Sequence, residues 1–201
     1  AMSIDTLHMR DELREMRERT QQADEALRRL QEELDRASSQ ARHDPLTGAL
    51  NRKGLDEALQ REIARARRQG TAMCVSLLDL DNFKRLNDSL GHDTGDAALV
   101  HLAQVARSTM RPQDSLARYG GEEFLVVLPD TEQAKGVEVM KRLQRELTKQ
   151  FFLKDNEKVL ITFSAGVAQV GADEETTEAI KRADQAMYLA KRSGKNRVVA
   201  A

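Results

Sequence analysis

The first forty residues constrain the fold most strongly, because they contain neither glycine nor proline and carry an unbroken heptad repeat. Apolar or small residues recur at alternating spacings of four and three. The a positions are Leu13, Thr20, Leu27, Leu34 and Ala41, and the d positions are Met9, Met16, Ala23, Leu30 and Ala37. Such a narrow seam predicts one long helix that pairs with one partner helix. Residues 1–42 are therefore predicted to form a coiled-coil stalk for dimerisation and signalling.

Charges beside the seam favour a parallel homodimer. In that register Glu12 of one helix faces Arg17 of the other, and Arg19 faces Asp24, so both pairs are of opposite sign. Each exposed pair contributes under about 1 kcal/mol, so the pairs select the orientation more than they stabilise it. The alternative is a single helix packed against the rest of its own chain. The stalk can also serve as the docking platform for a regulatory protein, and this use is compatible with a dimer.

The remaining residues, 43–201, mix strand and helix patterns and predict an α/β (α+β) domain. The expected helices cover residues 52–68, 92–110, 131–150 and 174–193, and the expected strands cover 71–80, 115–118, 123–128, one or two segments of 159–170, and 197–200. This order predicts a central, largely antiparallel sheet with helices on its faces. We expect Cys74 to be a buried small apolar residue, and Phe151 and Phe152 to pack in the core.

The composition excludes several classes of protein. The 32 Lys and Arg residues balance 33 Asp and Glu residues, for a formal net charge of −1. This balance argues against binding to a nucleic-acid polymer, which usually requires a basic excess. A single cysteine excludes an intramolecular disulfide. No run of 18 apolar residues occurs, so the sequence predicts no membrane span, and the bacterial cytoplasm is the expected compartment.

Two acidic clusters are candidates for chemistry. Asp79 and Asp81 stand at the exit of a buried strand, where alternation predicts that both project to the same side and suit a hard divalent cation. Glu122 and Glu123 directly follow Gly120-Gly121 at the tip of a predicted hairpin. Glycines there permit positive φ and a close approach of a ligand to the backbone. Acidic loops after strands and charged surface turns are also common without any ligand.

Taken together, five segments resemble one family. They are DPLTGALNR (44–52), DLDNFKRLND (79–88), GHDTGD (91–96), GGEEF (120–124) and AMYLAKRSGKN (186–196). Over residues 43–199 the chain resembles the GGDEF family, the diguanylate cyclases. The resemblance implies a sheet flanked by helices, similar to the palm of nucleotidyl cyclases. It also implies the condensation of two GTP molecules into cyclic di-GMP with release of two pyrophosphates. Two copies of the domain must then face each other, and the stalk would tether them.

The resemblance implies a catalytic and metal-binding set. Asp79, Glu122 and Glu123 are the catalytic candidates. Asp79 and Glu122 would ligate Mg²⁺ or Mn²⁺, two ions per active site, with the Leu80 carbonyl assisting and Glu123 as a further ligand. The metals would stabilise the charge that develops during phosphoryl transfer. Whether Glu122 also takes the proton of the attacking hydroxyl stays open.

The resemblance also implies a guanine-reading pair, Asn87 and Asp96. An ionised aspartate only accepts hydrogen bonds, and the Watson–Crick edge of guanine offers two N–H donors that adenine lacks. Asp96 therefore favours guanine. The alternative for Asp96 is a residue that caps a helix beginning at Ala97.

Phosphate contacts are implied for the positions Phe83, Lys84, Lys191 and Lys195. The backbone N–H groups of Phe83 and Lys84 would lie at the start of a helix, where anions bind. Lys195 stands where the family usually has arginine, so the charge is kept but the planar fork is lost. For Lys191 the alternative is a solvated cation in the last turn of a helix.

A further implied site is inhibitory. Arg111 and Asp114 form an RxxD motif that precedes GGEEF by five residues. Arg111 would pair with a phosphate of cyclic di-GMP and Asp114 would accept guanine N–H groups, which predicts product inhibition. A second reading of the domain is a receptor that binds cyclic di-GMP at this motif without catalysis.

Overall fold

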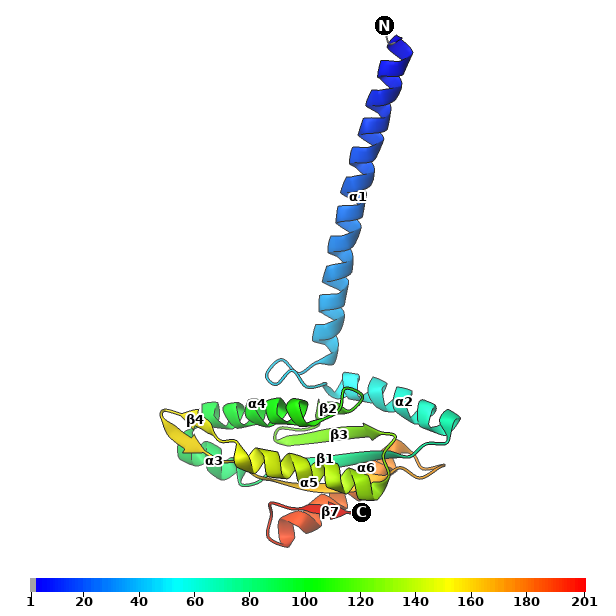
Figure 1. The fold of residues 1–201 in the computed structure, drawn as a ribbon. Coiled ribbons are helices and arrows are strands. Elements are labelled where there is room, and N and C mark those ends of the chain that lie inside the picture. Colours follow the sequence, from blue (N-terminus) through cyan, green and yellow to red (C-terminus); the bar gives the residue numbers. More distant parts are fainter. Residues whose placement is uncertain (1–2) are drawn as a thin grey trace. The chain divides into compact units, whose positions relative to one another are not determined.

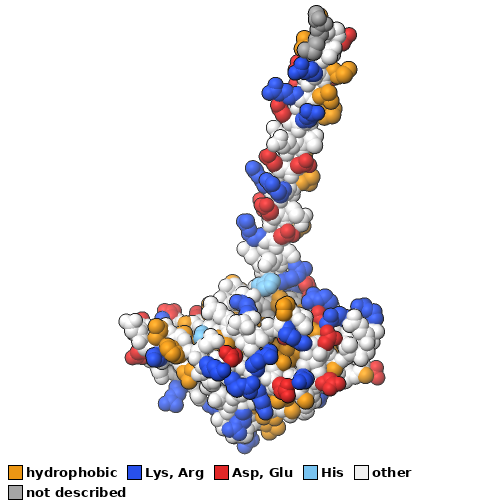
Figure 2. All heavy atoms as spheres, in the orientation of Figure 1, with side chains coloured by type: hydrophobic (Ala, Val, Ile, Leu, Met, Phe, Trp, Pro, Cys, Tyr) orange, Lys and Arg blue, Asp and Glu red, His pale blue; other side chains and the backbone are white. Residues whose placement is uncertain are grey.

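A computed structural model describes residues 3–201 and divides the chain into two compact units, one ending at Ala41 and one formed by Arg42–Ala201. The helix α1 (Ile4–Arg42), of 39 residues, forms the first unit as far as Ala41 and confirms the predicted long helix. No residue of α1 is buried. Figure 2 shows apolar side chains gathered along one side of this helix. Its pairing with a second copy stays a prediction.

The second unit is built on a five-stranded sheet with the order β2-β3-β1-β6-β7. Its strands are β1 (Met73–Leu80), β2 (Ser115–Arg118), β3 (Glu123–Pro129), β6 (Phe163–Gln169) and β7 (Val198–Ala200). All neighbouring strands pair antiparallel except β6 and β7, which pair parallel. The predicted central, largely antiparallel sheet is therefore confirmed.

Helices cover both faces of the sheet (Figure 1). They are α2 (Arg52–Gln69), α3 (Phe83–Leu90), α4 (His92–Thr109), α5 (Gln133–Lys149) and α6 (Thr176–Arg192). Side chains of β1 alternate between the two layers: Cys74 and Leu78 join the apolar cluster with α4 and α5, and Val75 and Leu77 join the cluster with α2 and α6. Because β1 is central and buried on both faces, its packing fixes the point at which the following residues leave the core.

Two features of the sequence determine where α2 begins and ends and how closely α6 packs against the sheet. Asn51 caps α2, because its side chain accepts a hydrogen bond from the Gly54 N–H, and Gly70 ends the helix in the left-handed region at φ 68°. Gly166 in β6 lets α6 approach closely, since a Cβ there would collide with the backbone of Ala183 and Met187. The carboxyl-terminal half of α6 is thereby held against the sheet.

The segment between α5 and β6 differs from the prediction. The strands β4 (Phe152–Lys154) and β5 (Glu157–Val159) form a separate hairpin whose turn residues, Asp155 and Asn156, have φ of 50° and 65°. Two such residues are typical of a two-residue hairpin turn. The expectation for Phe151 is wrong, because its position at the hairpin leaves it 46% exposed. Phe152 does pack against the core and contacts the ring of His101.

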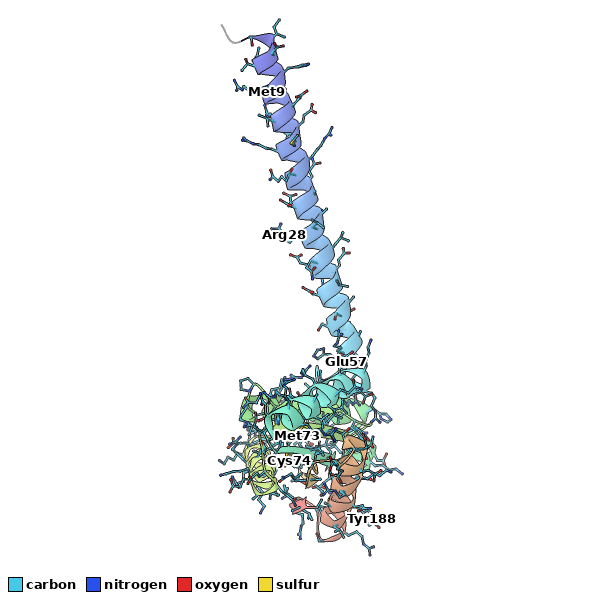
Figure 3. The ribbon with its side chains drawn as sticks, turned by 90° about the vertical axis from the view of Figure 1, so that its right-hand side faces the viewer. Met9, Arg28, Glu57, Met73, Cys74 and Tyr188 are labelled. Atoms are coloured by element: carbon cyan, nitrogen blue, oxygen red, sulfur yellow. The ribbon has the colours of Figure 1, made fainter. Side chains whose placement is uncertain are left out.

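The core itself agrees with the expectation for Cys74. Cys74 and Met73 lie at the start of β1 in the interior, whereas Tyr188 lies at the surface of α6 (Figure 3). Burial raises the pKa of the Cys74 thiol to about 12, which keeps the thiol neutral. Among residues 3–201, no helix is both long and apolar enough to cross a membrane.

Candidate functional site

The two acidic clusters meet at one end of the β1–β3 pair. Asp79 is the cross-strand partner of Glu123, and the Leu80 N–H donates a hydrogen bond of 3.2 Å to the Glu122 carbonyl. The antiparallel register thus brings carboxylates that are more than forty positions apart in the sequence to adjacent positions. This juxtaposition creates a negatively charged site at the exit of the central strand.

The turn between β2 and β3 does not use the positive φ that its two glycines permit. Among residues 3–201 the glycines with positive φ are at positions other than Gly120 and Gly121. A Cβ on Gly120 would instead stand 2.8 Å from the Glu123 carboxylate, whereas a Cβ on Gly121 would meet open space. The turn closes through the N–H groups of Tyr119 and Gly120, which both donate to the Glu123 carbonyl. Glycine at position 120 therefore leaves room for the carboxylate of Glu123.

Arg118 connects this turn to the DPLTGALNR segment (residues 44–52). Its guanidinium donates to the Gly121 carbonyl at 2.9 Å and forms an ion pair with Asp44 at 3.3 Å. Asp44 in turn accepts hydrogen bonds from the backbone N–H and the hydroxyl of Thr47. The start of the domain is thus connected through two side chains to the backbone of the acidic turn.

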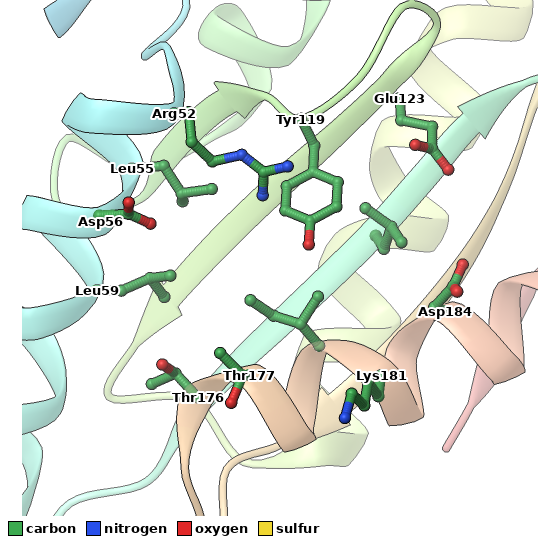
Figure 4. Close-up of a pocket in the computed structure, with 12 residues that line it drawn as sticks. Arg52, Leu55, Asp56, Leu59, Tyr119, Glu123, Thr176, Thr177, Lys181 and Asp184 are labelled. Atoms are coloured by element: carbon green, nitrogen blue, oxygen red, sulfur yellow. The ribbon is translucent and has the colours of Figure 1, made fainter.

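A cleft of about 390 Å³ opens beside Glu123 (Figure 4). Arg52 stacks over the ring of Tyr119 at 3.9 Å, and Glu123 and Asp184 extend toward each other from β3 and α6. Burial, followed by the negative charges of Asp79, Asp184 and Glu122, raises the pKa of Glu123. Burial and the charge of Asp79 also raise the pKa of Glu122. The site therefore favours an added positive charge.

Lys191 of α6 brings the nearest positive charge to these acids. Its Nζ lies 2.8 Å from Asp79 Oδ1 and 3.0 Å from Asp81 Oδ1. The same ammonium donates to the backbone carbonyls of Asp79, at 3.2 Å, and Leu80, at 3.1 Å. A neutralising cation and four oxygen atoms thus converge at the end of β1.

Asp81 lies beside Asp79, as the sequence predicts, because both carboxylates contact the Lys191 ammonium, but Asp81 also has internal partners. Its carboxylate is buried and accepts hydrogen bonds from the hydroxyls of Thr162 and Ser164 and from the Asn196 N–H, as well as from Lys191. Burial opposes the charged form, but these bonds outweigh it and lower the pKa of Asp81. Asp81 lies just beyond the last residue of β1, where its backbone N–H donates to the Thr162 carbonyl. Asp81 is an internal anchor, with its lone pairs already engaged.

The oxygen atoms at this site fit a hard divalent cation. Asp79 Oδ1 and the Leu80 carbonyl already point at one positively charged nitrogen, and Glu122 and Glu123 lie beside them. Oxygen donors of this kind are what Mg²⁺ and Mn²⁺ prefer. Within residues 3–201, no three His, Cys, Asp or Glu side chains by themselves form a metal-binding group.

The expected guanine-reading residues come from adjacent helices. Asn87 lies in α3 and Asp96 in α4, and Gly95 packs against Asn87 so closely that a Cβ would collide with its amide oxygen. The Asn87 Oδ1 atom is buried and accepts no hydrogen bond from the described residues. Asp96 is exposed and lies inside α4, which begins at His92, so the helix-cap alternative for Asp96 is wrong.

The expected phosphate-binding residues gather around the start of α3. Asn82 precedes the helix in the left-handed region, at φ 57°, and no side chain caps it. Lys195 Nζ donates to Asn82 Oδ1 at 2.6 Å. Lys84 is exposed and Phe83 packs against the core. Lys195 therefore contacts the start of α3 from the segment that follows α6. Lys191 contacts the carboxylates of Asp79 and Asp81 instead.

The RxxD motif forms a preassembled pair. Arg111 donates to both carboxylate oxygens of Asp114, at 2.8 and 3.3 Å, and also to the Pro129 carbonyl and the Thr131 hydroxyl. The hydrogen bond with Asp114 raises the pKa of Arg111. A cavity of about 440 Å³ that includes both residues adjoins the pair.

Sequence reasoning missed the supporting roles of Asp44, Arg118 and Asp184. Asp44 had a signal, since an Asp three residues before a Thr often forms a local turn. Arg118 directly precedes the acidic turn, but nothing in the sequence identifies its partner. Asp184 lies on a helix surface and gains its significance only from the packing of α6 beside β3.

Comparisons with known proteins agree on one family. The family profile described as "Diguanylate cyclase, GGDEF domain" matches residues 41–197. The diguanylate cyclase DgcP of Pseudomonas aeruginosa is 38% identical over 186 residues, which cover 92% of the chain and 28% of that protein. The response regulator PleD of Caulobacter vibrioides is 38% identical over 173 residues, covering 85% of the chain and 38% of PleD. The chain thus spans under two fifths of the length of these relatives.

Solved structures give the same result. The coiled coil and GGDEF domain of DgcB from Caulobacter crescentus, in complex with c-di-GMP, matches with a TM-score of 0.84 and 33% identity, covering 92% of this chain and 99% of that one. The diguanylate cyclase SiaD of Pseudomonas aeruginosa, in complex with its activator SiaC, matches with a TM-score of 0.80 and 33% identity, covering 98% and 75%.

Proposed function

The chain belongs to the GGDEF domain family, and from this premise we propose that it is a diguanylate cyclase. It condenses two GTP molecules into cyclic di-GMP and releases two pyrophosphates. In each half of the reaction the 3′-oxygen of one GTP bonds to the α-phosphorus of the other, the bond to pyrophosphate breaks, and the hydroxyl proton leaves. The meeting of Asp79 with Glu122 and Glu123 at one sheet end carries this proposal.

Asp79, the Leu80 carbonyl, Glu122 and Glu123 would hold Mg²⁺ or Mn²⁺, two ions per site. When bound, these ions neutralise the triphosphate and stabilise the charge that develops in the transfer. The chain contributes the fixed positions of the ligands. Asp79 is set by the β1–β3 register, and Glu122 by the backbone hydrogen bond to Leu80. Rigid ligands of this kind lower the cost of organising the transition state.

Asn87 and Asp96 read the guanine base. The buried Asn87 Oδ1 is an acceptor that the described residues leave unsatisfied, and such an atom is costly unless a ligand or water bonds to it. Asp96 offers an exposed carboxylate that accepts the N1 and N2 hydrogens of guanine. Adenine supplies no such pair of donors, so the pocket selects GTP over ATP.

The triphosphate binds across the start of α3. The backbone N–H groups of Phe83 and Lys84 face an uncapped helix start, which is a favourable environment for an anion. Lys84, Lys191 and Lys195 add positive charge. Lys195 binds a phosphate oxygen as a point charge, without the bidentate contact that arginine makes.

Two copies of the domain supply the two GTP molecules. The apolar seam of α1 pairs with a second copy and raises the local concentration of the domains. Exposed Tyr188 and Leu189 border the site and line, with Asp79 and Lys191, a hollow of about 490 Å³. This apolar border suits coverage by the second domain during catalysis. Since SiaD binds an activator, we also assign the stalk a regulatory protein as partner. A GTP-dependent reaction is expected in the cytoplasm.

The cyclase proposal is tested by incubating the chain with GTP and Mg²⁺ and separating the nucleotides. We expect cyclic di-GMP and two pyrophosphates for each molecule of product. Binding of cyclic di-GMP without any turnover of GTP would contradict the proposal and identify a receptor.

Arg111 and Asp114 form the inhibitory site for the product. We expect cyclic di-GMP to slow the wild-type protein, and Arg111→Ala to weaken that inhibition by at least about tenfold, or ~1.4 kcal/mol. Arg145→Ala, which removes the same charge from an exposed position of α5, should keep the inhibition. The measurement is initial rate against product concentration, with thermal unfolding recorded for each variant. Unchanged inhibition in folded Arg111→Ala contradicts the assignment.

A further inference from the structure

The ammonium of Lys191 lies on oxygen atoms that a metal ion would have to reach. Its side chain is 22% exposed, and its ammonium contacts the Asp79 carboxylate, the Asp79 and Leu80 carbonyls and the Asp81 carboxylate at 2.8–3.2 Å. A lysine in the last turn of a helix usually extends into solvent. Here the ammonium instead sits among oxygen atoms that come from the end of the central strand.

Two of these groups are the ones assigned to the divalent cation. Mg²⁺ bonds oxygen at about 2.0–2.1 Å, so it must lie well inside the distances at which the ammonium now sits. Two positive charges so close together would also repel strongly. The Asp79 carboxylate and the Leu80 carbonyl can therefore serve Lys191 or a metal, but not both in this arrangement.

We propose that Lys191 is a built-in counter-cation that holds the metal-binding oxygens when no nucleotide is bound and must leave them before a divalent cation binds. The inference rests on the metal and triphosphate assignments of the proposed function. Lys191 then has two successive partners, first the acidic site and afterwards the triphosphate. Its departure couples the binding of metal to the binding of nucleotide.

The fold permits this exchange by a movement of the side chain alone. The α6 backbone is fixed, because β6 packs against it at Gly166 with no room for a Cβ. The lysine stem has four carbons and rotates freely. Asp81 also stays in place when the ammonium leaves, since Thr162, Ser164 and the Asn196 N–H hold it independently. The site therefore changes its cation without rearranging its walls.

The direction of the coupling follows from the charges. A metal that arrives alone must displace the ammonium from the Asp79 carboxylate and the Leu80 carbonyl, and it brings no anion to replace them. A metal that arrives with a triphosphate brings phosphate oxygens that accept the displaced ammonium. Differential interactions of this kind make the two ligands favour each other's binding. Metal affinity should thus be weak in the free protein because of Lys191 itself.

The test measures Mn²⁺ binding to the nucleotide-free full chain, with free Mn²⁺ followed by electron paramagnetic resonance. We expect Lys191→Met to bind Mn²⁺ about tenfold more tightly than wild type, or ~1.4 kcal/mol. Lys195→Met removes the same charge nearby without vacating the oxygens and is the matched control, so its affinity should change by less than about twofold. An equal or weaker affinity in Lys191→Met overturns the inference, as does an equal gain in Lys195→Met.

A second measurement uses only the wild-type protein, so it does not depend on folding of a variant. Acylation of Lys191 by an amine reagent, read by mass spectrometry, should rise when saturating Mn²⁺ expels the ammonium. Unchanged labelling of Lys191 at saturating Mn²⁺ overturns the inference. If these results fail while GTP still yields cyclic di-GMP, the cyclase proposal stands. If no cyclic di-GMP forms and no Mn²⁺ binds, both are wrong.

Discussion

Asp44 is the single residue that most clearly ties the start of the domain to the acidic turn. Its carboxylate pairs with Arg118, which also holds the Gly121 carbonyl. Partial burial pushes the pKa of Asp44 upward, but hydrogen bonds from Thr47 and the charge of Arg118 outweigh it, so the pKa is lowered. A lowered carboxyl pKa stabilises the fold above the unfolded pKa, and this contribution is lost as the pH falls through the folded pKa.

Asp44→Asn tests this contact. We expect a loss of about 1–2 kcal/mol in the free energy of unfolding at neutral pH, because hydrogen bonds to a charged group are weakened. The difference from wild type should be constant from about pH 5 to 8 and shrink below about pH 4, as Asp44 is protonated in both states. Urea unfolding at each pH measures it. Asp173→Asn, in an exposed loop, is the control. A pH-independent difference contradicts the ion pair.

Individual residues also mark the limits of sequence reasoning. Asp79, Glu122 and Glu123 were predicted to share one site from the resemblance to the GGDEF family, whereas the pattern by itself gave two separate acidic clusters. The internal partners of Asp81 could not be predicted, since Thr162, Ser164 and Asn196 lie more than eighty positions away in the sequence. For Gly120 the sequence reveals a small residue, but only the structure shows that space rather than positive φ requires it.

Among the elements, α6 matters most to the site. It carries Lys191, faces Glu123 through Asp184, and packs against β6 at Gly166. The close approach is a backbone-to-backbone contact, which flexible side chains cannot relieve. The position of α6 on the sheet therefore depends on the absence of one Cβ.

Gly166→Ala should disturb this packing. The added Cβ meets the backbone of Ala183 and Met187, so we expect a loss of about 1–3 kcal/mol in the free energy of unfolding. Gly121→Ala, where a Cβ meets open space, is the matched control and should be close to wild type in stability. Chemical denaturation of both variants measures the difference. Equal stabilities would show that α6 is not constrained at this point.

The elements that sequence analysis predicted well have long periodic patterns or β-branched runs. The hairpin β4–β5 was missed because its strands have only three residues each, although the Asp155-Asn156 turn was a signal. Phe151 was misplaced for the same reason, since an apolar residue beside a short hairpin can remain exposed. Short elements carry too few residues for periodicity to decide.

At the scale of the whole molecule, we propose that a dimerising stalk serves a domain that works only in pairs. Heptads predict the long helix from sequence, but the pairing involves a second copy, which no single chain contains. The seam residues Leu27 and Leu30 are 64% and 60% exposed, and in water such a stripe favours association. Activity should therefore depend on the stalk at low protein concentration.

Negative charges introduced into the apolar seam of α1 test whether activity depends on the stalk. The double variant Leu27→Glu, Leu30→Glu should lose about 10²-fold or more in specific activity at micromolar protein, because tethering no longer raises the local concentration. Gln21→Glu, Gln22→Glu adds the same charge outside the seam and should behave like wild type. Specific activity over a dilution series, with sedimentation of each variant, gives the comparison. Equal activity of the seam variant at every dilution contradicts the role of the stalk.

We propose that Asp79 and Glu122 carry the chemistry of a cyclase. The most direct measurement is cyclic di-GMP formed from GTP and Mg²⁺ by wild type, Asp79→Ala, Glu122→Ala and the control Asp173→Ala. We predict product from wild type and control, and a fall of at least about 10²-fold in both site variants, with circular dichroism unchanged. Near-normal product formation by either folded site variant would contradict the account.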